Sequence, residues 1–420
     1  MKKNASSPHL QLRENFFEKI LSMLFRLHRQ GYPSFLVGGA VRDLLLHRPI
    51  RDADLLTRAP REILERLYPG GKHIGTTAYP IYLVRIFAEK TGEIAFLDAE
   101  SLEENLARRD FTVNSLGMNH RGELLGSPEA FRDVRKRLLR WNGSPEKRLR
   151  QDPLRALRLC RFGISLEGFR ILPGSLEACP PFAKACAALP GERIGREMRL
   201  GLQSGGKNFP EFLCRAGLLE HLCPGGNRRK SPEEFFFFSR ACSEKRSFSC
   251  GTAAFFLDLY DNLSPEEIGK RSFSLLRHWR WPEKEAREVR GLLKMWSSLK
   301  KPLSFREGLD LLERFGFPRM EILLELLALD PEKTALLDEL QQQLFLWKAR
   351  LLQASEKGML LPGKECAEKF AIPPGPLLGE LLREKRRKIL ETPDLSPEEL
   401  YCWLEERSHK LEKKGNPRKT

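Results

Sequence analysis

The sequence predicts an α+β protein, in which a mixed-sheet head over residues 1–130 precedes a helical remainder of the 420-residue chain. Strand-like apolar runs alternate with helical patterns near the N-terminus, whereas helical periodicity alone continues from about Arg132. The head is expected to contain strands at 34–38, 53–57, 81–86 and 92–98, and helices at 14–30, 40–47, 60–67 and 102–108. Later helices are expected at 153–164, 192–204, 209–221, 283–299, 304–315, 320–329 and 333–355.

Composition indicates the kind of partner and compartment. The formal net charge is +16, which favours a polyanionic partner. The nine cysteines include no C-x-x-C pair, which is typical of scattered thiols in a reducing compartment. The N-terminal residues have no apolar core and no run could span a bilayer, so we expect a cytoplasmic protein without a signal peptide. The Pro/Gly-rich segment 224–232 predicts a boundary.

A glycine pair and two aspartates lie close together in the head. The apolar run Phe35–Val37 leads into Gly38 and Gly39, and a helical pattern follows. A glycine turn feeding a helix N-terminus offers bare N–H groups to phosphate. Asp52 and Asp54 are two apart on an expected strand, so their carboxylates share a face and suit Mg²⁺. Together these features predict nucleotidyl transfer from a nucleoside triphosphate.

A third carboxylate is expected from a neighbouring strand. Glu93 is the candidate, although a solvated acid on an edge strand is the plainer alternative. Asp98 lies in the same segment, but its opposite parity places it on the other face.

The segment R-R-D-F-T-V-N offers groups for a nucleotide. Arg108 and Arg109 suit triphosphate oxygens, because guanidinium groups bind phosphate in a bidentate manner. Asp110 and Asn114 are four apart, so acceptors on one helical turn are available to ribose hydroxyls. A solvated helix face is the alternative reading of these charges.

Residues 132–161 carry eleven Lys or Arg residues, and Asp152 and Arg155 lie among them. Asp152 is expected near a helix N-cap with Arg155 beside it on the helix surface. An acceptor beside a donor matches the Watson–Crick edges of cytosine and adenine and mismatches those of uracil and guanine. An ordinary capping pair is the alternative.

Taken in order, these motifs resemble the class II tRNA nucleotidyltransferases, the family of CCA-adding enzymes and bacterial poly(A) polymerases. The matching segments are G-G-A-V-R-D with Asp52 and Asp54, then R-R-D-F-T-V-N, Q-D-P-L-R-A-L-R, G-E-R-I-G-R-E at 191–197, and 209–224. The resemblance implies a polymerase-beta-like nucleotidyltransferase head at 1–130, a helical neck at 131–224 with a nucleotide-selecting pocket, and a tRNA-binding helical body and tail at 225–420.

The resemblance also implies residue roles. Asp52 and Asp54 would bind Mg²⁺, with Glu93 assisting in catalysis. Asp152 and Arg155 would select the base, and Glu192 and Arg193 would support that pocket. The remaining nucleotide-binding positions implied by the motifs are Gly38, Gly39, Arg42, Arg108, Arg109, Asp110, Asn114 and Arg158.

The chain departs from the family pattern at three places. Gln151 replaces the usual glutamate before Asp152, and Gly126-Ser127-Pro128 replaces a common Asp-Pro. Asp98 replaces a frequent arginine, and only Ala99–Ser101 remain of a long loop that the family uses to switch from CTP to ATP. The short loop favours addition of the two cytidines alone, and harmless loop variation is the alternative.

The sequence therefore predicts an enzyme that adds C, with or without A, to the tRNA 3′ end from CTP and ATP without a nucleic-acid template. If it adds only C, a separate A-adding partner enzyme must follow it. A poly(A) polymerase and a non-catalytic RNA-binding protein are the alternatives.

Overall fold

The computed structural model describes residues 8–50, 52–76, 79–87, 90–96, 101–226, 234–299 and 301–415. Two compact units form, and both combine distant parts of the chain. The first contains Met1–Glu234 and His278–Trp281, and the second contains Phe235–Arg277 and Pro282–Thr420. Asp98, the shortened loop and most of segment 224–232 lie outside the described residues, so those expectations remain predictions. The division into head, neck, body and tail also remains a prediction.

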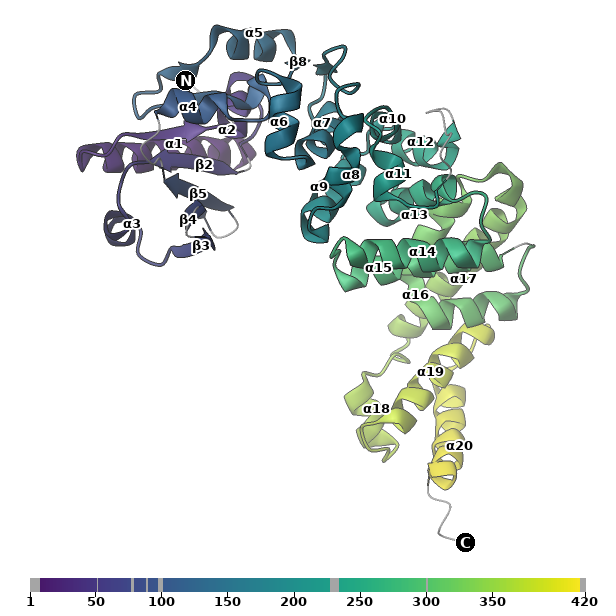
Figure 1. The fold of residues 1–420 in the computed structure, drawn as a ribbon. Helices are drawn as coiled ribbons and strands as arrows, with labels where there is room; N and C mark the ends of the chain where they lie inside the picture. The colour runs from purple at the N-terminus through teal and green to yellow at the C-terminus, as the bar shows by residue number, and fades with distance from the viewer. Residues whose placement is uncertain are drawn as a thin grey trace, which may run out of the picture. The chain divides into compact units, whose positions relative to one another are not determined.

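A seven-stranded mixed sheet forms the start of the first unit (Figure 1). Its order is β3-β4-β5-β2-β1-β6-β7, and the β2–β5 pair is parallel whereas the other neighbours are antiparallel. The predicted mixed-sheet α+β class is confirmed. The strands are β1 Ser34–Val37, β2 Ala53–Thr57, β3 Lys72–Thr76, β4 Tyr79–Phe87, β5 Lys90–Phe96, β6 Leu116–Met118 and β7 Leu124–Gly126.

The helices beside this sheet include the four that the sequence pattern predicts and one, α5, that it does not. The sheet-bearing part contains α1 Pro8–Arg29, α2 Gly39–Leu45, α3 Arg61–Leu67, α4 Leu102–Ala107, the 3₁₀ turn η1 Thr112–Asn114 and α5 Pro128–Lys136. Strands β3, β6 and β7 were absent from the sequence prediction, and β6 and β7 have only three residues each, too few to show alternation.

The rest of the first unit is mainly helical. It contains α6 Pro145–Gln151, α7 Leu154–Ser165, η2 Pro180–Phe182, α8 Ala183–Ala187, α9 Gly191–Gln203, α10 Phe209–Arg215 and α11 Leu218–Leu222, with the two-stranded β8 Leu138–Leu139 and β9 Arg170–Ile171. The single helix expected at 209–221 is interrupted at Gly217. That residue has φ 66°, a left-handed conformation that glycine adopts without strain.

Two glycines of α9 allow the segment His278–Trp281 to pack on this helix. A methyl group at Gly191 would lie 1.9 Å from the His278 carbonyl oxygen, and one at Gly195 would lie 2.0 Å from that of Trp279. Trp279 is buried, and the Trp281 indole donates to the Gly195 carbonyl at 3.1 Å. Backbone thus meets backbone at this contact, which explains why His278–Trp281 belongs to the first unit.

Among its described residues, the second unit contains helices joined by turns and loops, and no strand. Its elements are α12 Phe236–Ser243, α13 Phe248–Leu259, α14 Pro265–His278, α15 Glu283–Ser298, α16 Phe305–Leu327, η4 Pro331–Lys333, α17 Thr334–Glu356, α18 Gly363–Lys369, α19 Pro376–Glu391 and α20 Pro397–Gly415. The two helices expected at 304–315 and 320–329 correspond to the two arms of α16, which are separated at Gly316, whose φ of 76° and ψ of 163° are not helical. Phe235 and Phe238 are fully buried, as a core segment requires.

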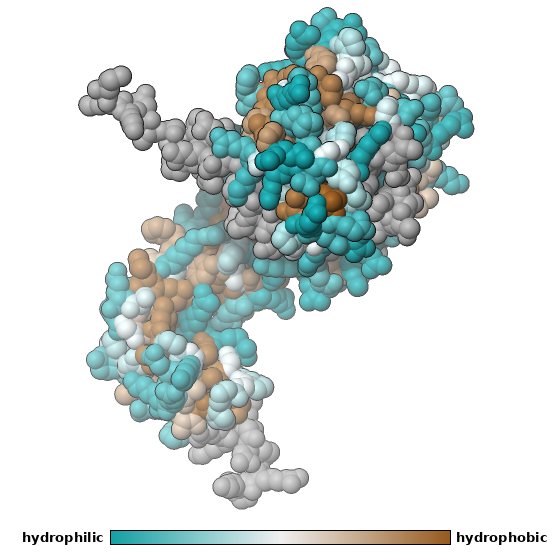
Figure 2. All heavy atoms as spheres, turned by 90° about the vertical axis from the view of Figure 1, so that its left-hand side faces the viewer, coloured by the Kyte–Doolittle hydropathy of each residue, from teal (hydrophilic) through white to brown (hydrophobic). Residues whose placement is uncertain are grey.

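The surface, the cysteines and the helices can be compared with what the composition predicts. The face of the first unit turned to the viewer in Figure 2 is mostly hydrophilic, with smaller apolar patches. All nine cysteines are free thiols. Among the helices of the described ranges, none combines the length and the apolar character needed to cross a membrane.

Replacing Gly195 with alanine should lower the free energy of unfolding by about 1–3 kcal/mol, because the added methyl group overlaps the Trp279 backbone. Gly251→Ala is the matched control, because Gly251 also lies within a helix, α13, and a methyl group added there would have no neighbouring atom within 4 Å. Calorimetric thermal unfolding measures both variants. An unchanged transition in Gly195→Ala would mean that α9 and the Trp279 segment are not in backbone contact.

Candidate active site

The turn after β1 forms the floor of the candidate site. Gly38 has φ 76° and ψ −136°, and its N–H donates to the Leu116 carbonyl at 2.8 Å. A methyl group at Gly38 would lie 2.6 Å from Arg109 Nη1 and 3.7 Å from Asp54 Oδ2. Glycine is therefore required here both for its backbone angle and for the close approach of Arg109.

Carboxylates gather on the two parallel strands beside this turn. Asp54 lies on β2 directly opposite Glu93 on β5, and Asp52 comes just before β2. The register therefore places Glu93 on the strand next to the aspartates, as the sequence predicts. Strand β5 supplies this neighbour because it pairs in parallel with β2.

Like charges repel one another within this group. Lost hydration raises the pKa of Asp54, the charge of Asp52 adds to the rise, and Arg109 opposes it. Lost hydration and then the charge of Asp54 raise the pKa of Glu93. A divalent cation would relieve this repulsion, and carboxylate oxygens are the ligands that Mg²⁺ prefers. Within the described residues no group of three or more His, Cys, Asp and Glu side chains is arranged as a metal site. Asp52 and Asp54 are the neighbouring carboxylates that could hold a metal.

Arg109 lies between the glycine turn and Asp54. Burial lowers its pKa, whereas the charges of Asp54 and then Asp110 oppose that change. Its buried Nε has no hydrogen-bond partner among the described residues. Arg108 is exposed, and its carbonyl accepts from Arg155 Nη2 at 2.9 Å. The Arg109 guanidinium is thus placed against the glycine turn.

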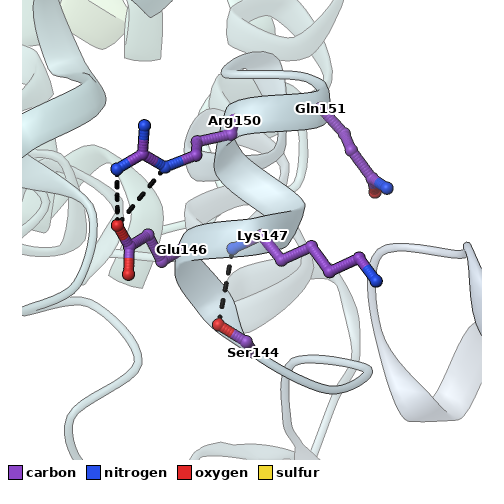
Figure 3. A pocket seen from close by; sticks show the side chains of 5 residues that line it. All are labelled: Ser144, Glu146, Lys147, Arg150 and Gln151. Carbon is purple, nitrogen blue, oxygen red and sulfur yellow. Dashed lines mark hydrogen bonds and ion pairs between the residues drawn. The ribbon is translucent and has the colours of Figure 1, made fainter.

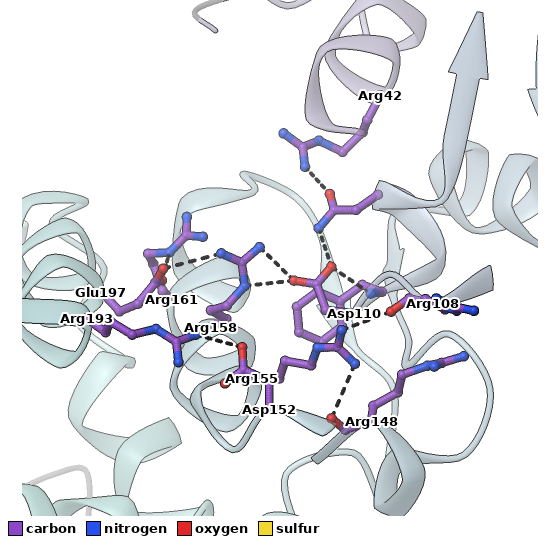
Figure 4. Close-up of polar contacts among 12 residues, drawn as sticks. Arg42, Arg108, Asp110, Arg148, Asp152, Arg155, Arg158, Arg161, Arg193 and Glu197 are labelled. Carbon is purple, nitrogen blue, oxygen red and sulfur yellow. Dashed lines mark hydrogen bonds and ion pairs between the residues drawn. The ribbon is translucent and has the colours of Figure 1, made fainter. Parts of the chain in front are cut away.

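An ion-pair network joins Asp110, Arg158, Glu197 and Arg161, and Asp110 directly follows Arg109 in the chain (Figure 4). Arg158 donates to Asp110 Oδ2 through Nε at 2.8 Å, and its Nη2 lies 2.7 Å from the same oxygen. Arg158 also pairs with Glu197 at 3.4 Å, and Glu197 accepts from Arg161 at 2.5 Å. Glu197 was not predicted as a site residue, although it is the last residue of the G-E-R-I-G-R-E motif.

The predicted ribose-reading acceptors are engaged inside the protein. Asp110 Oδ1 accepts from the Phe111 N–H at 2.9 Å and from Asn114 Nδ2 at 3.0 Å. Asn114 Oδ1 accepts from Arg42 Nη1 at 2.6 Å, and the buried Arg42 also pairs with Asp43 at 2.9 Å. These contacts give Asp110, Asn114 and Arg42 a supporting position behind the glycine turn.

Asp152 and Arg155 are each held by other groups. Asp152 Oδ1 accepts from the Leu154 N–H at 3.2 Å, and its Oδ2 accepts from Arg193 at 2.9 Å. Arg155 Nη1 donates to Gln151 Oε1 at 3.0 Å. The neutral amide of Gln151 thus supports Arg155 by a hydrogen bond in place of an ion pair. Glu192 is exposed at the start of α9.

An open hollow of about 480 Å³ lies along α6 (Figure 3). Arg150 binds Glu146 at 2.6 Å on one side of this helix, and Ser144 accepts from the Lys147 N–H at 3.4 Å. Gln151 also lines the hollow, and its side chain accepts the hydrogen bond from Arg155.

The Asp110 network predicts a pH-dependent stability difference. Burial raises the pKa of Asp110, but the Arg158 charge and the hydrogen bonds from Asn114 and Phe111 outweigh burial and hold it below its ordinary value. Asp110→Asn should therefore lower the free energy of unfolding at pH 7 by about 2 kcal/mol. This loss is smaller than that expected on breaking a fully buried ion pair, because 32% of the Arg158 side chain is exposed.

This deficit should shrink as the pH falls below about 4, because the wild-type carboxylate then loses its advantage on protonation. Urea unfolding at several pH values measures it, with exposed Glu146→Gln as the control. A deficit that stays constant down to pH 3 would contradict an ionised Asp110 in the native state.

Comparison with known proteins finds similarity to one family model and to CCA-adding enzymes. Residues 34–78 match the family described as the poly A polymerase head domain. A CCA-adding enzyme from Geobacillus thermodenitrificans is 29% identical over 94% of this chain and 98% of its own. One from Streptococcus gordonii is 27% identical over 93% and 98%.

Solved structures agree with this result. The crystal structure of a Bacillus stearothermophilus CCA-adding enzyme in complex with CTP has a TM-score of 0.61 at 26% identity, covering 95% of this chain and 99% of that one. A Thermotoga maritima CCA-adding enzyme complexed with tRNA_CCA shares the fold, with a TM-score of 0.57 at 21% identity, covering 97% of each chain. This chain is thus similar to CCA-adding enzymes along nearly its whole length, as its motifs predict.

Proposed function

We propose that this protein is a Mg²⁺-dependent nucleotidyltransferase that adds C, with or without A, to the 3′ end of tRNA from CTP and ATP without a nucleic-acid template. The observation that supports this proposal most directly is that Arg109 and Asp54 both approach the turn at Gly38. A methyl group added at Gly38 would touch Arg109. This arrangement brings a phosphate-binding cation, a metal-binding carboxylate and an open backbone turn to one place. The near full-length similarity to CCA-adding enzymes supports the proposal.

The carboxylates would carry the metal chemistry. Asp52 and Asp54 would hold Mg²⁺, and Glu93 beside Asp54 would assist. Bound Mg²⁺ would activate the tRNA 3′-hydroxyl and neutralise the departing pyrophosphate. The charge of Arg109 beside Asp54 would help to hold the triphosphate against the acidic cluster.

The nucleotide would lie between the turn and the Asp152/Arg155 pair. The backbone at Gly38 and Gly39 would face phosphate, with Arg108 and Arg109 binding its oxygens. We assign Arg42, Asp110, Asn114 and Arg158 to nucleotide binding as supports, because their contacts fix the segment that carries Arg109.

Base selection would rest on one acceptor and one donor. A free lone pair of Asp152 would accept the amino group of cytosine or adenine, and Arg155 would donate to the adjacent ring nitrogen. Uracil and guanine offer a carbonyl and a ring N–H in these places, so they would leave like groups facing one another.

The tRNA partner follows from charge and from the relatives. A net charge of +16 favours phosphate contacts with the acceptor arm, which need no base sequence. The Thermotoga maritima relative was solved complexed with tRNA_CCA. We place the protein in the cytoplasm, with residues 1–130 as head, 131–224 as neck and 225–420 as body and tail.

Primer extension on a tRNA ending at the discriminator base should give two added nucleotides with CTP and Mg²⁺. A third nucleotide when ATP is supplied identifies CCA addition. Its absence identifies CC addition and a separate A-adding partner. A long ladder with ATP alone would replace the proposal with a poly(A) polymerase.

Asp54→Asn should reduce the rate of addition by at least a hundredfold while tRNA affinity stays within about twofold, because the carboxylate acts in chemistry and not in tRNA binding. Single-turnover extension and filter binding measure the two quantities. Glu62→Gln, an exposed acid on α3, is the control and should retain activity. Full activity in Asp54→Asn would favour an RNA-binding protein without this catalytic site.

A further inference from the structure

The backbone carbonyls at the end of α4 are held by residues of the helical part of the first unit. The Leu106 carbonyl accepts from Asn142 Nδ2 at 2.8 Å, and the Ala107 carbonyl accepts from Arg148 Nη2. The Arg108 carbonyl accepts from Arg155 Nη2 at 2.9 Å. The last carbonyls of a helix have no partner within it and carry partial negative charge, so guanidinium groups are well suited to cap them.

Arg148 is the central member of this cap. It is 7% exposed, and its Nε donates to the Asn142 carbonyl at 2.6 Å while its Nη1 donates to Gln151 Oε1 at 2.9 Å. Within the described residues its guanidinium contacts carbonyl and amide oxygens and forms no ion pair. All three nitrogens of the planar Arg148 guanidinium therefore donate hydrogen bonds, an arrangement that a lysine ammonium cannot reproduce.

Gln151 transmits this geometry to Arg155. Its single Oε1 accepts from Arg148 at 2.9 Å and from Arg155 at 3.0 Å. Arg155 Nη1 also donates to the Arg148 carbonyl at 3.3 Å. The orientation of the Arg155 guanidinium is therefore set by Arg148 on one side and by the α4 end on the other.

We propose that Arg148, acting through Gln151, is a positioning residue that sets base selectivity by fixing Arg155 against the Ala107–Arg108 backbone. This inference rests on the proposed role of Arg155 in reading the base. It adds that selectivity depends on a group that touches no nucleotide. Any change in triphosphate binding through Arg108 or Arg109 would weaken CTP and UTP alike, so the ratio of the two affinities isolates base selection.

The test uses equilibrium binding to the full chain without tRNA, so it does not need catalysis. Isothermal titration measures the affinities of CTP and UTP, each with Mg²⁺. In Arg148→Lys and Gln151→Leu the ratio of CTP to UTP affinity should fall about tenfold, mainly through weaker CTP binding. Gln151→Glu keeps the acceptor and should keep the ratio. Arg150→Ala, an exposed neighbour paired with Glu146, is the matched control.

Equal losses of CTP and UTP affinity, or an unchanged ratio, in Gln151→Leu would overturn the inference. That variant removes an exposed side chain, so it decides the matter even if Arg148→Lys unfolds. A wild-type protein without preference for CTP over UTP would also overturn it. Absence of primer extension with an intact CTP preference would instead refute the proposed function and leave this inference standing.

Discussion

Asp110 and Arg158 form an ion pair, buried on the Asp110 side, that joins the sheet-bearing part of the first unit to its helices. Asp110 directly follows Arg109, so the pair fixes the backbone from which Arg109 reaches the glycine turn. Arg158 is fixed in turn by Glu197 on α9. A carboxylate this deeply buried is tolerable only because each of its oxygens has a donor: Phe111 and Asn114 donate from the same segment, and Arg158 donates from α7. The site geometry is therefore a property of the whole first unit.

The network also separates two kinds of charge. Glu197 and Asp110 neutralise the inner arginines, Arg158 and Arg161, whereas Arg108 and Arg155 lie closer to solvent. The acidic cluster of Asp52, Asp54 and Glu93 lies on the other side of Arg109. A triphosphate with its metal carries both signs of charge, and the site presents cations and carboxylates in adjacent places. Electrostatic complementarity of this kind costs little reorganisation when the ligand binds.

Local pattern was enough to predict where several candidate site residues lie. Asp54 and Glu93 face one another on the neighbouring strands β2 and β5, Asp52 comes just before β2, and Gly38 follows a strand that leads into a helix. Arg148 and Glu197 could not be found this way, because their partners lie up to 41 and 39 residues away along the chain. The inward contacts of Asp110 and Asn114 were missed for the same reason. Helical spacing shows that two side chains share a face, but it does not show whether that face meets water or another segment.

The backbone contact between α9 and Trp279 has a consequence for how the chain can be divided. The polypeptide passes between the two units after Glu234, before His278 and after Trp281. A fragment ending at the Pro/Gly-rich segment would leave the small-residue face of α9, at Gly191 and Gly195, without the chain that covers it. Glu197, which anchors Arg158, lies on the same helix. The part of the chain after this boundary therefore cannot be exchanged freely between related proteins. Such an exchange would replace residues 278–281, which cover α9, and would thereby disturb the candidate nucleotide site through Glu197.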